Sequence, residues 1–164
     1  MQLGQALSLL REYGVLLVAV IFFLEHLNCP GLPAGVIMPA VGMLAAQGGG
    51  NVTVFIVVSV LASEAGCLVT YGLFYWRGAS ILGRMKRRSE KMSGFIGRCT
   101  VMMEKHGLKG VFLCHLLPVL RTIVSIPAGI FRVKKVPFAL YTLLGIIIWN
   151  TALILFGYFF RQAL

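Results

Sequence analysis

Long apolar runs alternate with shorter polar segments along the chain, and two of these runs are uninterrupted. Val52 to Trp76 and Val136 to Phe160 each supply 25 predominantly apolar positions. A helix of that length spans about 37 Å, which is enough to cross the hydrocarbon core of a bilayer with some tilt. The pattern therefore predicts membrane-spanning helices over residues 52–76 and 136–160.

An apolar but broken segment precedes the first uninterrupted run. Residues 14–28 predict a short helix, and residues 29–47 stay apolar although their prolines and glycines argue against one straight helix. Irregular backbone at membrane depth is tolerated only where protein or a wet cavity surrounds it, so we expect a re-entrant hairpin over residues 29–47. The residues that would shape its backbone are Pro30, Gly31, Pro33 and Gly35.

A segment of like design precedes the second uninterrupted run. Residues 108–131 are apolar but contain Pro118, Arg121 and Pro127, which predicts a second re-entrant hairpin. The sequence Leu32-Pro33-Ala34-Gly35 of the first hairpin recurs as Ile126-Pro127-Ala128-Gly129 in the second. The match is short, but it falls at corresponding places in two units that each consist of a broken segment followed by a whole one.

A strongly basic segment, residues 77–107, separates the two units. The chain has 15 Lys and Arg against 5 acidic residues, and nine of these bases lie between Arg77 and Lys109. Region 77–109 is therefore predicted to be cytoplasmic, which makes the two units inverted. Apolar residues among the charges predict an amphipathic helix on the inner membrane surface with anionic headgroups as its partner. A solvated basic loop is the alternative, and nucleic acid is a much weaker candidate partner.

The composition excludes an ordinary soluble domain. Hydrophobic residues make up 59% of the chain and charged residues 12%, whereas about 25% of residues are charged in typical soluble domains. We expect an all-α polytopic membrane protein, a single domain over residues 1–164, with two re-entrant helical hairpins and membrane-spanning helices in an inverted repeat. The alternative is a bundle of proline-kinked helices without a transport function.

Three charged residues, Glu25, Glu64 and Arg121, lie within or at the ends of apolar runs. An ionised side chain at the bilayer centre costs at least about 2.5–3.5 kcal/mol, so such residues usually serve a function. We expect Arg121 to bind a phosphate group, with His115 assisting, because a guanidinium stays charged and donates bidentately. Glu25 and Glu64 are expected either to pair with Arg121 as a static brace or to bind and release a proton in a transport cycle.

Other polar residues are assigned structural roles, and no motif for catalysis is found. His26 is expected at the membrane interface. Asn150 is expected to bond freed hairpin carbonyls, a helix-packing role, rather than to contact substrate. The chain has 4 cysteines without a CxxC pair, no Asp, and no HExxH or GxSxG motif. We therefore predict a protein that is not an enzyme and that uses no metal or other cofactor.

Three motifs, together covering about residues 15–150, resemble those of a known family. They are Phe22-Phe23-Leu24-Glu25 followed by Pro30-Gly31-Leu32-Pro33, then Ser63-Glu64-Ala65-Gly66 with Tyr71 and Arg77-Gly78, and finally His115 to Thr122 continuing through Gly129 to Trp149-Asn150. These are similar to the signatures of DedA-like membrane proteins, also called the SNARE-associated or VTT-domain family.

The resemblance implies a multi-pass protein of the bacterial cytoplasmic membrane that translocates a phosphate-bearing lipid, such as undecaprenyl phosphate or phosphatidylethanolamine. It also implies that Glu25 and Arg121 occupy functional positions. The chain departs from the family pattern at Ala34-Gly35, where the family often has an acidic residue, and at His115, where it has an arginine. We predict a lipid flippase or scramblase, with proton coupling as an option. The alternatives are a proton-coupled small-solute or ion transporter and a non-transporting scaffold for envelope maintenance, and the oligomeric state, including a homo-oligomer, stays open.

Overall fold

The computed structural model describes residues 3–27, 34–88, 90–115, 117 and 120–163. Within these residues every regular element is a helix, in agreement with the predicted all-α class. The elements follow one another in the order α1 (Leu3–His26), α2 (Ala34–Leu44), the π-helical turn η1 (Ala45–Gly49), α3 (Val52–Arg88), α4 (Glu90–His106), α5 (Leu108–His115), α6 (Ser125–Ile130) and α7 (Lys135–Ala163).

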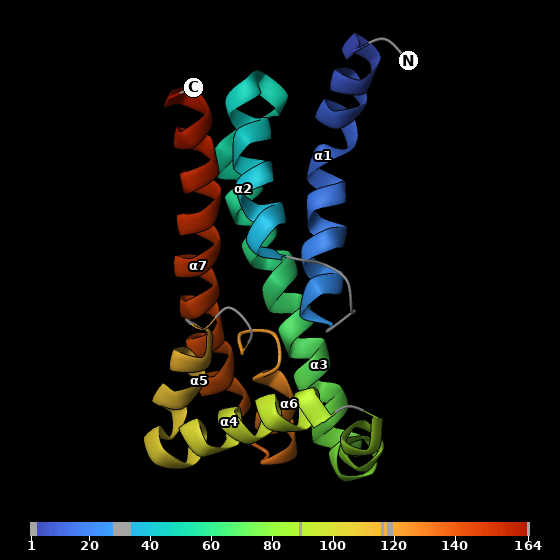
Figure 1. The fold of residues 1–164 in the computed structure, drawn as a ribbon, viewed down its shortest axis with the longest axis vertical. Helices are drawn as coiled ribbons and strands as arrows, with labels where there is room; N and C mark the ends of the chain where they lie inside the picture. Colours follow the sequence, from blue (N-terminus) through green and yellow to red (C-terminus); the bar gives the residue numbers. More distant parts are fainter. Residues whose placement is uncertain (1–2, 28–33, 89, 116, 118–119, 164) are drawn as a thin grey trace.

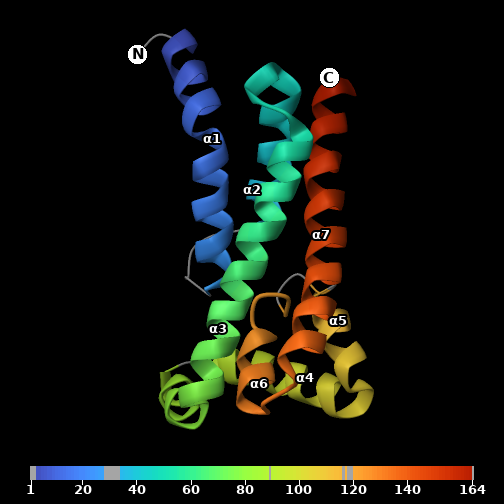
Figure 2. The ribbon, with the colours of Figure 1, turned by 180° about the vertical axis from the view of Figure 1, so that it is seen from behind.

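The helices form an elongated bundle in which α3 and α7 run along nearly the whole length (Figure 1). α1 descends from the end that carries the N-terminus and stops part-way along, and α2 rises back to that same end. α5 and α6 occupy the opposite end, where α4 lies across the bundle, and the view from behind shows the same division (Figure 2). Each end of the bundle therefore has its own pair of shorter helices beside the two long ones.

Three helices, α1, α3 and α7, are longer than the apolar runs from which they were predicted. α1 begins at Leu3 rather than at residue 14, α3 continues to Arg88 rather than ending at residue 76, and α7 extends slightly beyond 136–160. The apolar parts of these helices agree closely with the predicted runs, as in Val52–Gly78 for the predicted 52–76. The helices continue further because Arg and Lys end an apolar run without ending a helix, since both are good helix formers. The backbone does leave helical geometry at Arg77, with φ −125° and ψ 16°, so α3 bends where its apolar part meets its basic part.

The first predicted hairpin contains a regular helix where irregular backbone was expected. Pro39 lies inside α2, so this proline does not end the helix. Pro39 stands in the middle of this 11-residue helix, where it lacks the hydrogen bond to the carbonyl of Gly35 and its ring crowds that carbonyl. Pro30, Gly31 and Pro33 lie outside the described residues.

A tight turn then leads from η1 into α3. Gly48 has φ 78° and Gly50 has φ 151°, a region that glycine adopts at little cost. Oδ1 of Asn51 accepts a hydrogen bond from the backbone N–H of Thr53 at 2.9 Å, which caps the first turn of α3. The chain reverses here at the end of the bundle that holds the N-terminus (Figure 1).

Glycines allow the helix backbones to approach closely. A Cβ atom on Gly42 of α2 would lie 1.9 Å from the carbonyl oxygen of Ile154, and one on Gly157 of α7 would lie 2.0 Å from that of Pro39. Gly66 has the same role between α3 and α1, where a Cβ atom would lie 2.8 Å from a carbonyl oxygen of α1. Such contacts between backbones are typical of helix pairs in membranes.

The basic segment 77–107 is divided between two helices. Its first part continues α3, and its second part forms α4 across the end of the bundle. Cys99 and Met103 of α4 are buried and belong to a core cluster with Val111 and Cys114 of α5, whereas Val101 is 60% exposed. The helix is thus present, but much of its described apolar face packs on the protein.

Two helical segments are long and apolar enough to cross a membrane, Val52–Gly78 and Lys135–Ala163. Only 33% and 28% of their most apolar windows are buried inside the protein. Leu61 and Phe156, each 62% exposed, are examples of the outward-facing apolar side chains. Apolar helices with outward apolar faces are what a lipid surrounding requires.

Candidate functional site

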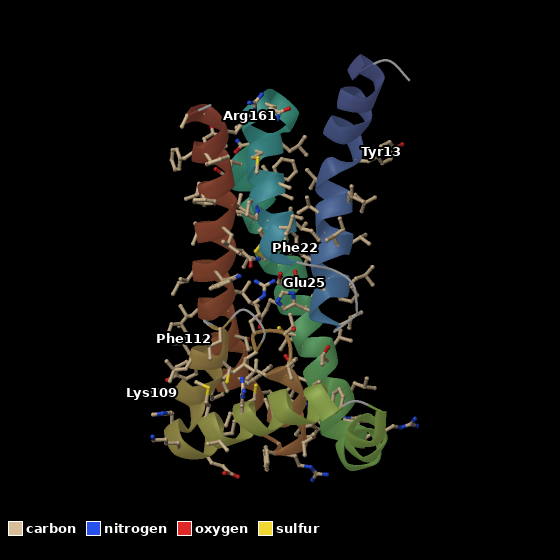
Figure 3. The ribbon with its side chains drawn as sticks, in the orientation of Figure 1. Tyr13, Phe22, Glu25, Lys109, Phe112 and Arg161 are labelled. Carbon is tan, nitrogen blue, oxygen red and sulfur yellow. The ribbon has the colours of Figure 1, made fainter. Side chains whose placement is uncertain are left out.

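The site centres on an ion pair between Glu25 and Arg121. Glu25 lies near the end of α1, and Arg121 lies in the turn between α5 and α6. Nη2 of Arg121 donates to Oε1 of Glu25, and the two side chains are only 3% and 5% exposed. Figure 3 shows Phe22 and Glu25 directed from α1 into the bundle, whereas Tyr13 on the same helix points outward. The structure thus brings together two of the charged residues that the sequence singled out.

The guanidinium group of Arg121 also contacts two further helices. Nη1 lies 3.8 Å from the sulfur of Met38 on α2, and the guanidinium carbon lies 5.9 Å from the centre of the Trp149 ring on α7. A cation over an indole face is stabilised by the ring quadrupole, and more so when it is shielded from water. The cation is therefore held at the junction of α1, α2, α7 and the α5–α6 turn.

The ion pair leaves one oxygen of the carboxylate without a partner. Oε2 of Glu25 is buried and has no hydrogen-bond donor among the described residues. A buried acceptor without a partner is costly, and Arg121 has donors in a fork that can serve an anion with more than one oxygen. The site thus holds a strong anion-binding group whose present partner uses only one of its two oxygens.

Glu64 lies elsewhere, on the contact between α3 and α7. Its two carboxylate oxygens lie 3.1 and 3.0 Å from the hydroxyl oxygen of Thr142. That hydroxyl has one hydrogen and is equally close to the carbonyls of Phe138 and Ala139, so it donates to one of these acceptors at a time. Of the two acids predicted near Arg121, the structure pairs Glu25 with it and places Glu64 against Thr142.

The remaining predicted residues fall into two groups. His115 is the last residue of α5, its side chain is not among those described, and Pro118 lies outside the described residues. Pro127 and Gly129 are buried in α6, where a Cβ atom on Gly129 would lie 2.6 Å from the carbonyl oxygen of Tyr71. Gly35, which corresponds to Gly129 in the short repeat, is exposed and has open space around it. The two glycines therefore differ in surroundings despite their matching sequence.

His26 is a residue that the sequence interpretation misplaced. It is fully buried rather than interfacial, and its Nδ1 lies 3.0 Å from the carbonyl oxygen of Phe22. Its own carbonyl oxygen accepts a hydrogen bond from the hydroxyl of Thr70 at 3.0 Å.

Asn150 packs between two helices, but its partners are serine hydroxyls of α3 rather than the hairpin carbonyls that the sequence interpretation expected. Its side-chain nitrogen lies 3.2 Å from the hydroxyl of Ser59 and 3.3 Å from that of Ser63, so it connects α7 with α3. All three side chains are buried. The two serines lie one helical turn apart on α3 and face Asn150. The sequence interpretation did not single them out, because isolated serines in an apolar helix are common.

Comparison with known proteins identifies the family. The sequence model of the VTT domain matches residues 30–159, which is most of the chain. The chain belongs to the VTT-domain family. This confirms the resemblance to DedA-like proteins that the three motifs indicated.

Curated relatives of this VTT-domain protein align over most of their length. Undecaprenyl phosphate transporter A of Staphylococcus aureus is 28% identical over 152 residues, covering 90% of this chain and 74% of that protein. Protein DedA of Escherichia coli is 27% identical over 160 residues, covering 93% and 73%. An alkaline phosphatase-like protein of Lactococcus lactis is 26% identical over 162 residues, covering 92% and 72%. No solved structure matches the chain.

Proposed function

We propose that this VTT-domain protein moves a phosphate-bearing lipid between the leaflets of the bacterial cytoplasmic membrane, with Arg121 as the group that binds the phosphate. The observation that carries the proposal is a buried guanidinium whose carboxylate partner is used through one oxygen only. Arginine binds phosphate and carboxylate through the same fork of donors. Undecaprenyl phosphate is the first candidate substrate, because a relative is named as its transporter, and phosphatidylethanolamine is the second.

We propose that α1 with α2 and α5 with α6 form two re-entrant hairpins, the arrangement through which this fold would perform the function. In this arrangement α1 and α2 enter the membrane from one side, α5 and α6 enter from the cytoplasmic side, and the two units form an inverted repeat. The placement of the pairs at opposite ends of α3 and α7 fits that arrangement (Figure 1). The first hairpin is then formed by α1 and α2 rather than lying within residues 29–47, so Glu25 belongs to it, Arg121 belongs to the second hairpin, and the ion pair joins the two.

The transport cycle follows from the two anions that compete for Arg121. With a side chain only 3% exposed, Arg121 meets a lipid phosphate only when the hairpins separate and Glu25 releases it. A proton bound by Glu25 removes the competing negative charge, and the phosphate takes its place. When the ion pair forms again, the proton and the phosphate both leave. His115, at the end of α5, assists Arg121 in binding the phosphate. Glu64, between α3 and α7, gates the movement of these two helices.

Lipid translocation in proteoliposomes tests this proposal. Vesicles carry fluorescent phosphatidylethanolamine or, separately, a labelled polyprenyl phosphate, and dithionite quenching reports movement between leaflets. The comparison is between wild type, Arg121→Met and the control Arg161→Gln, which changes an exposed arginine at the far end of α7 (Figure 3). We expect one lipid to move with wild type and with Arg161→Gln, and not with Arg121→Met at equal amounts of folded protein. Equal movement with Arg121→Met would refute the assigned role.

One observation favours a second candidate, a non-transporting scaffold. The ion pair is fully formed and buried, as a static brace between helices would be. A scaffold predicts that neither lipid moves with the folded wild-type protein, and that loss of function in cells follows loss of protein abundance. The transporter predicts that a folded Arg121 variant is inactive at normal abundance.

A further inference from the structure

A cavity of about 210 Å³ lies at the end of the bundle that holds α4, away from the ion pair of Glu25 and Arg121. It opens where α3 bends at Arg77 and where the chain turns from α6 into α7. Its lining includes Tyr75, Trp76, Arg77, Gly78, Ile130 and Arg132. Its volume accommodates several water-sized groups, because one water molecule needs about 10–15 Å³ of such space.

Among the described residues, the charged side chains that line the cavity are both positive. Arg77 and Arg132 both line the cavity, no acidic residue does, and neither arginine forms a salt bridge within the described part of the chain. The guanidinium of Arg132 and the ammonium of Lys135 lie 5.5 and 5.4 Å from the centre of the same Tyr75 ring. Cations gathered around one ring repel each other, and a bound anion would relieve that repulsion.

The backbone at both arginines departs from the regular helix. Arg132 has φ 52°, a conformation that costs a non-glycine residue free energy and that favours glycine. Arg77 has φ −125° and ψ 16° inside α3. The segments that carry the two arginines pack closely on each other, since a Cβ atom on Gly78 would lie 2.8 Å from the side chain of Ile130. Glycine would adopt this backbone conformation at a lower free-energy cost than Arg132, which points to a function of the arginine side chain.

The location selects a lipid as the source of the anion. The cavity lies at the end of the apolar segment Val52–Gly78 and just before the start of Lys135–Ala163. Trp76 lines it and is 85% exposed, next to Tyr75, and aromatic side chains of this kind gather at the level of lipid headgroups. A group bound between Arg77 and Arg132 therefore sits at the depth of headgroup phosphates.

We propose that this cavity binds the phosphate group of an anionic membrane lipid, with Arg77 and Arg132 donating to the phosphate oxygens and Trp76 packing along the lipid. This site is distinct from the Arg121 site and does not depend on transport. It would hold a lipid of the cytoplasmic leaflet against the junction of α3, α6 and α7.

Binding of short-chain lipids to the purified full chain in detergent tests the proposal. Dioctanoyl phosphatidic acid, dioctanoyl phosphatidylcholine and inorganic phosphate are titrated separately, and binding is followed by tryptophan fluorescence and by microscale thermophoresis. The variants are Arg77→Gln, Arg132→Gly and both together, with Arg161→Gln as the control. Arg132→Gly is the decisive variant, because glycine suits φ 52° and the protein should unfold at the same or a higher temperature.

We expect phosphatidic acid to bind wild type and Arg161→Gln alike, and to bind each single cavity variant about tenfold more weakly. Phosphatidylcholine and inorganic phosphate should bind much more weakly than phosphatidic acid. Unchanged binding in both Arg77→Gln and Arg132→Gly would overturn the site. Equally tight, arginine-dependent binding of inorganic phosphate would overturn the assignment to a lipid, and equal binding of phosphatidylcholine would overturn the role of the negative charge.

Discussion

The buried pair of Glu25 and Arg121 makes a prediction about stability that a double-mutant cycle can measure. The two side chains are 5% and 3% exposed, so water screens neither charge once its partner is removed. Removing one partner of a buried ion pair costs about 3–5 kcal/mol, because the other charge stays desolvated and unpaired. We expect Glu25→Gln and Arg121→Met each to lower the free energy of unfolding by about that amount.

The double variant Glu25→Gln/Arg121→Met leaves no charge at this place. Replacing a whole buried pair by neutral side chains of similar size is often neutral or stabilising, so we expect the double variant to lie within about 2 kcal/mol of wild type. The coupling free energy between the two residues should then be at least about 3 kcal/mol. SDS titration in mixed micelles, followed by far-UV circular dichroism, gives all four unfolding free energies. Additive effects of the two substitutions would refute the reasoning, because they would mean that the two charges do not interact.

The two single variants should also differ in their dependence on pH. In Arg121→Met the carboxyl group of Glu25 remains and can bind a proton, which removes the uncompensated charge. The loss of stability in this variant should therefore shrink at acidic pH and grow as the pH rises. In Glu25→Gln the guanidinium cannot lose its proton, so the loss should persist across the same pH range. The same SDS titration at several pH values checks this, and a parallel pH dependence of both variants would contradict it.

The close contacts between helices make two further predictions. Gly157→Ala should destabilise the protein by about 1–3 kcal/mol, because the new methyl group meets the backbone of α2. Gly72→Ala, in open space on α3, should be neutral or slightly stabilising. Thermal unfolding in detergent measures both variants, and equal effects would contradict the packing described. Asn150→Leu leaves the hydroxyls of Ser59 and Ser63 without this partner inside the α3–α7 contact, and we expect a loss of about 1–3 kcal/mol. The triple change Asn150→Leu/Ser59→Ala/Ser63→Ala should recover part of that loss, and no recovery would show that the hydrogen bonds are not its cause.

The sequence predicts the main parts of this fold because apolar runs define the spanning segments and prolines mark the broken ones. It does not predict where helices end, since α3 continues through a strongly basic stretch to Arg88. The position of Pro39 in the middle of α2 shows a related limit, because a proline inside a helix removes a hydrogen bond without always ending the helix. Helix bounds depend on backbone geometry, which hydropathy does not report.

The sequence also identifies the charged residues of the site without identifying their partners. The cost of a charge in an apolar run singles out Glu25, Glu64 and Arg121 equally. Glu25 and Arg121 are 96 positions apart in the chain. Their pairing depends on where the end of α1 lies relative to the α5–α6 turn. The contacts of Arg121 with Met38 and Trp149 also could not be predicted from the sequence. In a membrane helix that is apolar on all sides, the sequence does not indicate which face packs against a cation.

In the proposed cycle a lipid phosphate replaces Glu25 as the partner of Arg121, and ligand-induced stabilisation measures this replacement. Farnesyl phosphate, a short polyprenyl phosphate, is added to wild type, Glu25→Gln, Arg121→Met and the double variant, all in an Arg132→Gly background that weakens the peripheral cavity. A ligand that binds the folded state raises the free energy of unfolding in proportion to the logarithm of its concentration over its Kd. We predict that farnesyl phosphate stabilises Glu25→Gln more than wild type, because the phosphate restores a partner to the unpaired guanidinium, and that it does not stabilise either protein with Arg121→Met. Equal stabilisation of wild type and Glu25→Gln, or stabilisation that persists without Arg121, would contradict the account.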